Sequence, residues 1–375
     1  MWGVILPPQF KKTIVFHDHR NRRMRKGPRK EEEDRQIPAA EDRAPALPLS
    51  PSELSGHLLG AHVSIAGGVE RAVERALQCG FSAAQIFLKN CRQWRAPALR
   101  PEEASAFRKA ASASGLFFFG HAGYLLNLAS ASDLLAEQSL QALRDEVERA
   151  KLLGLPFLVL HPGTAARGEE PEAALSRLAH RLRSLFPKGS LQPEVGIALE
   201  TMAGQGSQLG WRLEQLSWLL EELDDPRRFG ICLDTAHLWA AGYPIATPAG
   251  YRAFTAELEE RRLAARVWAI HLNDSAAPFG SRRDRHEHLG RGTLGLSAFG
   301  QILQDPRWSR VPMVLETPKE DGGEADCRNL RAILPFLSEK PPGTRLEKAR
   351  RAPKNGKKAL AFLPDRTYRV YHEST

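Results

Sequence analysis

The sequence is poor in cysteine and has no long apolar run, and each absence excludes a class of protein. Its four cysteines are scattered along 375 residues. They form no CxxC pair and are too sparse for a disulfide scaffold, so we expect a reducing compartment. No apolar stretch approaches the roughly 20 residues that span a bilayer, which predicts no membrane contact.

The central part of the sequence also lacks an excess of charge of either sign. The formal net charge is +9, yet basic and acidic residues are equal in number within residues 58–340. The excess lies in residues 1–57 and 341–375, which have no sustained apolar periodicity, and we predict that both are disordered extensions. The acidic run at 31–34 and the missing apolar h-region predict no signal peptide. A basic tail commonly only aids solubility, so the net charge alone is weak support for DNA binding.

Eight short apolar runs fill the predicted domain, residues 58–340, and each leads into a polar position. The runs end at His62, Leu88 (followed by Lys89 and Asn90), His121, His161, Glu200, Asp234, His271 and Glu316. Helical apolar spacing occurs between them, at 69–77, 134–153, 173–185 and 213–223. Buried strands that alternate with helices indicate a parallel sheet covered on both faces. Eight such units predict an α/β fold, a closed (β/α)8 TIM barrel.

Six of the strand-end residues are of types that bind metal ions. They are His121, His161, Glu200, Asp234, His271 and Glu316. In a TIM barrel the carboxyl ends of all strands surround one mouth, so these side chains are expected to converge. One polar residue at a strand end often only hydrogen-bonds into a loop, but six together favour a metal centre. Mixed imidazole and carboxylate ligands suit zinc or manganese better than calcium.

Two further motifs add candidate ligands near the same mouth. His237 lies three residues after Asp234. If the sixth strand turns directly into a loop there, both side chains face the mouth without having to share a metal. Asp284 and His286 form an i, i+2 pair whose side chains project to one side of an extended loop. With His237 they would complete a second centre that has three protein ligands and open coordination positions.

Successive segments of the chain form a series of short blocks over about residues 58–338. In order, they include GAHVSIAGGVERA, LKNCRQWRAP, HAGYLLNLAS, LHPGTA, ICLDTAHLWAAGY and VLETP. These blocks resemble the signature blocks of the endonuclease IV family of apurinic/apyrimidinic endonucleases. The resemblance implies a xylose-isomerase-like TIM barrel that holds three zinc ions, with manganese as an alternative at one or more sites. It implies that His121 and His161 bind the first metal, that Glu200 bridges to the second, that Asp234, His271 and Glu316 complete the second, and that His237, Asp284 and His286 hold the third.

The resemblance also implies a reaction and a substrate. The expected enzyme is a monomeric DNA repair endonuclease of the bacterial cytoplasm and nucleoid. It would hydrolyse the phosphodiester bond 5′ to an abasic site in double-stranded DNA, leaving a 3′-hydroxyl and a 5′-deoxyribose phosphate, with Glu200 as a catalytic residue. Arg92, Gln93 and Tyr124 would enter the duplex. The residues alone favour a solvated loop for Arg92 and Gln93 and a core aromatic residue for Tyr124; the resemblance favours the DNA contact.

The sequence departs from the family pattern at a few positions and leaves some roles open. Ala236, Trp239, Pro244 and the pair Thr201-Met202 stand where other residues are usual. None removes a ligand, so we expect them to affect only how the ligands are held. Lys89 could contact a phosphate or have a structural role. His62 and His288 are expected to assist the ligands, and Trp94 is expected to pack.

Two other functions remain compatible with parts of this pattern. A sugar isomerase or epimerase on a related barrel would also use Glu200, Asp234, His271 and Glu316. It has no need of the additional histidines or of Asp284. A non-catalytic protein that binds damaged DNA would use Arg92, Tyr124 and the basic tails, and for it the ligand set would have no purpose.

Overall fold

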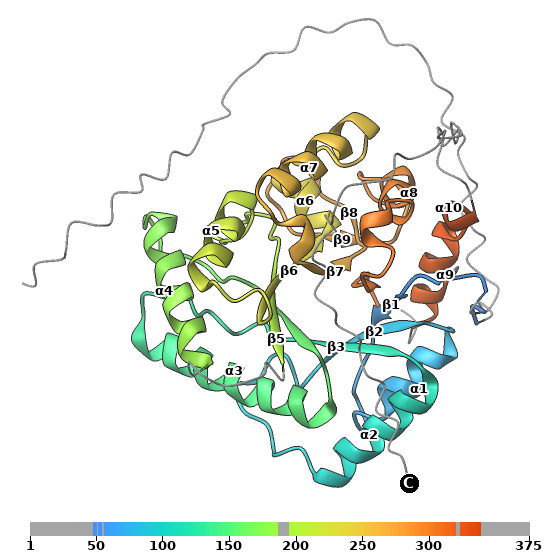
Figure 1. The fold of residues 1–375 in the computed structure, drawn as a ribbon, viewed down its shortest axis with the longest axis horizontal. Coiled ribbons are helices and arrows are strands. Elements are labelled where there is room, and N and C mark those ends of the chain that lie inside the picture. The colour runs from blue at the N-terminus through green and yellow to red at the C-terminus, as the bar shows by residue number, and fades with distance from the viewer. Residues whose placement is uncertain (1–47, 51, 55, 187–194, 320–322, 339–375) are drawn as a thin grey trace, which may run out of the picture. The chain divides into compact units, whose positions relative to one another are not determined.

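A computed structural model of the protein describes residues 48–338 except 51, 55, 187–194 and 320–322. Most of the predicted N-terminal extension and the whole predicted C-terminal tail, 341–375, lie outside the described residues. In the described part, eight parallel strands close into a barrel in the order β1-β10-β7-β6-β5-β4-β3-β2. The helices lie outside this ring of strands (Figure 1). The predicted TIM barrel is therefore confirmed.

The barrel strands are short and almost entirely buried. They are β1 (Leu59–His62), β2 (Ala83–Phe87), β3 (Phe117–His121), β4 (Phe157–Leu160), β5 (Gly196–Glu200), β6 (Phe229–Asp234), β7 (Val267–His271) and β10 (Met313–Leu315). Each ends within one residue of its predicted end. β4 and β10 stop just before His161 and Glu316, so these two side chains occupy the first positions beyond their strands.

Helices follow the strands around the barrel. They are α1 (Arg71–Gln78), α2 (Pro101–Ser114), α3 (Asp133–Leu153), α4 (Pro171–Leu185), α5 (Leu213–Leu223), α6 (Thr235–Ala241), α7 (Pro248–Glu260), α8 (Leu296–Leu303), α9 (Glu324–Ile333) and α10 (Pro335–Ser338), with 3-10 turns at Ala264–Arg266 and Pro306–Trp308. The four helices predicted from apolar spacing coincide with α1, α3, α4 and α5. None of the described helices has the length and apolar character needed to cross a membrane.

The barrel interior is filled at the end opposite the predicted mouth. The side chains that fill this end form an apolar cluster separate from the main core. In it, the rings of Phe119 and Phe157 stack with their centroids 5.0 Å apart. Trp268 packs against this cluster, and a Cβ atom on Gly230 would lie 2.3 Å from its indole ring. Glycine at position 230 therefore lets the indole fill the barrel. Polar side chains can gather only at the other end, where the strands finish.

The N-terminal boundary of the barrel domain differs from the predicted one. Leu49 and Leu54 are 4% and 3% exposed and belong to the main apolar core. The backbone N–H of Leu49 donates a hydrogen bond to the carbonyl oxygen of Cys79 at 2.9 Å. The interpretation of 1–57 as disordered is therefore wrong for these last residues, whose few leucines were too short a run to show periodicity. We propose that the barrel domain begins near Pro48.

A small hairpin between β7 and β10 was not predicted. It pairs β8 (Asp274–Ser275) with β9 (His286–Glu287) in antiparallel fashion. The buried carboxylate of Asp274 accepts hydrogen bonds from the backbone N–H groups of Ser275 (2.8 Å), Gly290 (2.9 Å) and Leu294 (3.0 Å). One side chain thus fixes both ends of the loop that carries Asp284 and His286.

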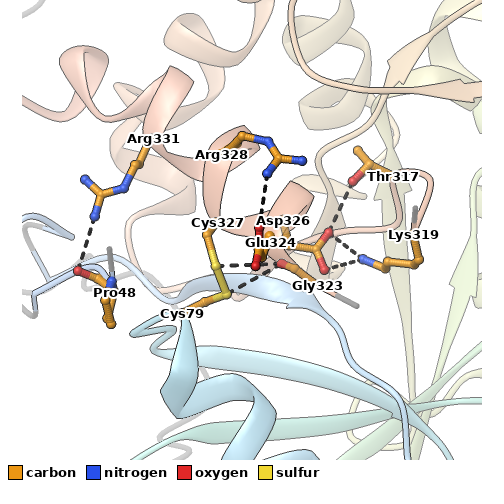
Figure 2. Close-up of a disulfide and its surroundings, with 10 residues drawn as sticks. All are labelled: Pro48, Cys79, Thr317, Lys319, Gly323, Glu324, Asp326, Cys327, Arg328 and Arg331. Carbon is orange, nitrogen blue, oxygen red and sulfur yellow. Dashed lines mark hydrogen bonds and ion pairs between the residues drawn. A yellow bond between two sulfur atoms is a disulfide. The ribbon is translucent and has the colours of Figure 1, made fainter. Parts of the chain in front are cut away.

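Two cysteines that are far apart in the sequence form a disulfide. Cys79 follows α1 directly and Cys327 lies in α9, with Cα atoms 5.4 Å apart and a sequence separation of 248 residues (Figure 2). The scattered cysteines in the sequence showed no sign of this pair, because only barrel closure brings the two helices together. Of the described cysteines, Cys91 and Cys232 are free.

Candidate metal centre

The structure brings the nine candidate ligands together at the carboxyl ends of the strands. Eight of the nine fall into three groups, and within each group the candidate ligand atoms lie within 4.8 Å of one another. The groups are His121, His161 and Glu200; Glu200, Asp234, His271 and Glu316; and Asp234, His237 and His286. The ninth residue, Asp284, has Oδ2 at 3.1 Å from Nε2 of His237 and Oδ1 at 3.5 Å from Nε2 of His286. All nine predicted positions therefore surround one mouth.

Glu200 lies at the centre of this arrangement because it ends β5 with its side chain fully buried. Its Oε2 atom is 3.3 Å from Nε2 of His121 and 3.0 Å from Nε2 of His161. Its Oε1 atom is 3.1 Å from Nδ1 of His271. The two oxygens of one carboxylate thus face two different groups of ligands, as a bridging ligand would require.

The ring orientation of each buried histidine is set by a hydrogen bond at its far nitrogen. Nδ1 of His121 lies 2.6 Å from the carbonyl oxygen of Ala122, and Nδ1 of His237 lies 2.9 Å from that of Thr201. A carbonyl oxygen only accepts, so both Nδ1 atoms carry a proton and both Nε2 atoms face the carboxylates. Metal-binding histidines show this same arrangement, in which the second nitrogen donates to a fixed acceptor.

Gln85, which the sequence analysis missed, plays the corresponding role for His271. It is fully buried in β2, and its Oε1 atom lies 2.9 Å from Nε2 of His271. Its Nε2 atom donates to Oε1 of Glu316 at 2.6 Å and lies 2.8 Å from Nδ1 of His62. The available signal was a single polar residue within the apolar run AAQIFL. His62 touches Glu316 at 3.2 Å, in keeping with its predicted assisting role.

The third group is built where β6 passes directly into helix α6, rather than into the loop that was considered. Asp234 is the N-cap of α6, and its Oδ1 atom accepts from the backbone N–H of His237 at 2.7 Å. Capping by an aspartate stabilises the first helical turn and so fixes the spacing of these two side chains. Thr201, one of the departures from the family pattern, is not a candidate ligand. Its Oγ1 atom accepts a hydrogen bond from the backbone N–H of Asp234 at 2.8 Å.

Asn273 connects two of the groups and was also missed. It is fully buried just after β7. Its Nδ2 atom donates to Oδ2 of Asp234 at 2.7 Å, and its Oδ1 atom accepts from the backbone N–H of Glu316 at 2.7 Å. It therefore orients one carboxylate and positions the backbone that carries another.

The buried carboxylates and imidazoles strongly shift one another's pKa values. Burial opposes ionisation of Glu200, but His271 and His161 hold its pKa well below the usual range. Burial opposes protonation of His237, yet Asp234 and Asp284 raise its pKa well above the usual value. The carboxylates thus favour positive charge at the mouth, beside residues such as Glu200 and His237 that are themselves buried. Oxygen and imidazole donors around such a negative site fit divalent zinc or manganese.

The three predicted DNA-contacting residues lie beside this centre. Tyr124 is 53% exposed, and its ring centroid is 5.8 Å from that of His161. It is therefore not the core aromatic residue that was the alternative. Arg92 and Gln93 are exposed on the neighbouring loop. The backbone N–H of Tyr124 donates a 3.2 Å hydrogen bond to the carbonyl oxygen of Cys91 in that loop.

Lys89 has a structural position rather than one open to a phosphate. Its side chain is 2% exposed, and Nζ lies 3.0 Å from Asp145 and 3.3 Å from Glu146. Glu146 in turn accepts from the backbone N–H of Gly123 at 3.0 Å. This buried pair connects the loop after β2, which carries Arg92, to the residue that precedes Tyr124. Trp94 packs against the main core, as predicted.

Comparisons with known proteins agree with this geometry. Residues 73–338 match a family model described as the xylose isomerase-like TIM barrel. The chain is 45% identical over 275 residues to a probable endonuclease 4 of Chloroflexus aurantiacus, covering 73% of this chain and 96% of that protein. A probable endonuclease 4 of a Geobacter species is 42% identical over 282 residues, covering 75% and 99%.

Comparison with solved structures also finds a similarity to endonuclease IV. The crystal structure of endonuclease IV from Thermus thermophilus superposes with a TM-score of 0.65 at 39% identity, covering 74% of this chain and 98% of that chain. A D-tagatose 3-epimerase-like protein superposes with a TM-score of 0.56 at 18% identity, covering 74% and 97%. The second likeness is a likeness of fold alone.

Proposed function

Because the chain belongs to the endonuclease IV family, we propose that it is a metal-dependent nuclease that cuts DNA at apurinic/apyrimidinic sites. It hydrolyses the phosphodiester bond 5′ to the abasic nucleotide and leaves a 3′-hydroxyl and a 5′-deoxyribose phosphate. One observation carries this proposal: His237, Asp284 and His286 join the six strand-end ligands at the same mouth. A barrel enzyme that acts on sugars needs one or two metals and has no use for this third group.

The ligand set has places for three metal ions, which we propose to be zinc, with manganese possible at one or more sites. His121 and His161 would hold the first, and Asp234, His271 and Glu316 the second, with Glu200 shared between them; His237, Asp284 and His286 would hold the third. When bound, such ions lower the pKa of a coordinated water toward about 7 and neutralise phosphate oxygens. Glu200 is the residue we regard as catalytic, because its two oxygens face both of the first two groups.

The chain's own side chains would select the abasic site. A nucleotide without a base has lost its stacking and pairing, so turning it out of the duplex costs less than turning out a normal one. Tyr124 exposes its ring beside His161, where it would fill space that the base has left and hold the sugar next to the ligands. Arg92 and Gln93, exposed on the adjoining loop, would enter the same gap.

The decisive experiment compares Glu200→Gln with wild type on a duplex oligonucleotide that contains one abasic site. We expect a fall in cleavage rate of at least about 100-fold, since even groups that only hydrogen-bond to a metal ligand are worth about 10–100-fold. Glu137→Gln, on the exposed face of α3, is the matched control and should cleave normally. Extension of the product by a DNA polymerase tests for the 3′-hydroxyl.

The outcomes separate this proposal from its alternatives. Near wild-type cleavage by Glu200→Gln would remove the assigned role of that residue. Binding of the abasic duplex without chelator-sensitive cleavage would indicate a damage-binding protein. Failure to cleave any DNA, together with conversion of a ketose by the metal-loaded protein, would indicate an epimerase.

A further inference from the structure

The disulfide joins the beginning and the end of the barrel. Strands β1 and β10 are neighbours, with Leu59 in register with Met313, so the first and last β/α units meet there. Cys79, after α1, and Cys327, in α9, connect the two units covalently (Figure 2). The two residues are 7% and 3% exposed. The bond therefore fastens α9 to the N-terminal part of the barrel from inside the helical layer.

Helix α9 also holds the segment that follows the candidate ligand Glu316. The carboxylate of Asp326, next to Cys327, accepts from Nζ of Lys319 at 2.6 Å and from Oγ1 of Thr317 at 3.3 Å (Figure 2). Thr317 and Asp326 are 2% and 3% exposed, so the contact between them is buried, while Lys319 reaches Asp326 from a partly exposed position. The position of the chain just after Glu316 thus depends on where α9 lies.

The same helix holds the segment that follows the candidate ligand His286. Oδ1 of Asn329 accepts from the backbone N–H of Leu289 at 3.1 Å, and its Nδ2 atom lies 3.1 Å from Nδ1 of His288. Nδ2 also donates to Oγ1 of Thr317 at 2.9 Å. One helix that is covalently attached to α1 therefore orders two of the segments that carry candidate ligands.

We propose that Cys79 and Cys327 form a reversible redox site. In its oxidised state, the metals bound by Glu316 and His286 are released more slowly. A thiolate of the pair attacks a low-molecular-weight disulfide, and the second protein thiolate then displaces the bound small thiol. Two protein thiols lose two electrons and two protons, and one small disulfide becomes two small thiols. Excess small thiol reverses the reaction. Because both sulfurs are buried, exchange requires α9 to open locally and is slow in the folded protein.

The proposal rests on the ligand roles given above, and its test needs no DNA. Zinc-loaded wild type is prepared oxidised and reduced, with Cys79→Ser/Cys327→Ser as a third sample and Cys91→Ser, oxidised, as the control. Thiols are counted after denaturation, and zinc release to a chromogenic chelator is timed. We expect two thiols in the oxidised wild type, from Cys91 and Cys232, and four in the reduced form. Release should be about 10-fold faster in the reduced and double-serine proteins and unchanged in Cys91→Ser.

Two results would overturn the proposal: four thiols after treatment with a small disulfide, or equal rates of release from oxidised and reduced wild type. The double-serine variant shows whether faster release arises from the missing bond or from zinc bound by the freed thiols. If that variant does not fold, wild type refolded with a reductant and with a small disulfide provides the comparison. An intact redox effect without cleavage of abasic DNA would refute only the proposed function.

Discussion

The Cys79–Cys327 bond makes a measurable prediction about the stability of the barrel. Cleaving it without changing the sequence restores the freedom of an unfolded loop spanning 248 residues. The chain-entropy relation gives about 5.5 kcal/mol for a loop of that length at 25 °C. Part of this is offset if the unfolded chain keeps residual structure, so we expect oxidised protein to be more stable than reduced protein by about 3–5 kcal/mol.

The assay is urea unfolding of metal-free protein, followed by circular dichroism, with and without a phosphine reductant. Removing metal from both samples separates the effect of the bond from any effect of ligand binding. The midpoint should fall on reduction, while Cys91→Ser, which leaves the disulfide intact, should match oxidised wild type. A difference below about 1 kcal/mol would refute the reasoning, because loop entropy would then not be the main effect of the bond.

Three further predictions concern buried polar groups away from the disulfide. Asp274→Asn should release the loop that carries Asp284 and His286, so the metal content per chain should fall while circular dichroism stays unchanged. Burial opposes ionisation of Asp305, but hydrogen bonds from Arg307 lower its pKa; its stabilising effect is therefore present above the unfolded pKa of about 3.9 and lost as pH falls below it. Asp305→Asn should thus lower the urea midpoint at pH 7 and have little effect near pH 3. Lys89→Met should destabilise by about 3–5 kcal/mol in urea unfolding, because Glu146 stays buried without its partner.

The strand ends could be predicted because two independent patterns coincide there. A buried strand is a continuous apolar run, and the polar residue that ends it marks the mouth of the barrel. His121 and Glu200 satisfied both conditions, and their convergence follows from barrel closure alone. The ligands beyond the strands, such as Asp284, show only a short i, i+2 pattern, and the resemblance to a family was needed to assign them to a metal.

The residues that orient the ligands could not be found in this way. Gln85 is one polar side chain within an apolar strand, and Asn273 follows a strand whose end was already assigned to His271. Their roles depend on contacts between strands that are far apart in sequence. The pairing of Cys79 with Cys327 could not be predicted for the same reason, since the two cysteines are far apart in sequence. Lys89 was ambiguous because its partners, on α3, are known only once the helix has packed.

Glu200 and Asp234 each belong to two of the three ligand groups, and this sharing has a thermodynamic consequence. If these groups hold the proposed metals, a carboxylate held in place by one bound ion would already be ordered for the next, so the proposed positions would not fill independently. Coupling of this kind is reciprocal: whatever strengthens retention at one position strengthens it at its neighbour by the same factor. The mouth of the barrel should therefore load and empty as a unit, with few partly filled molecules between the two states.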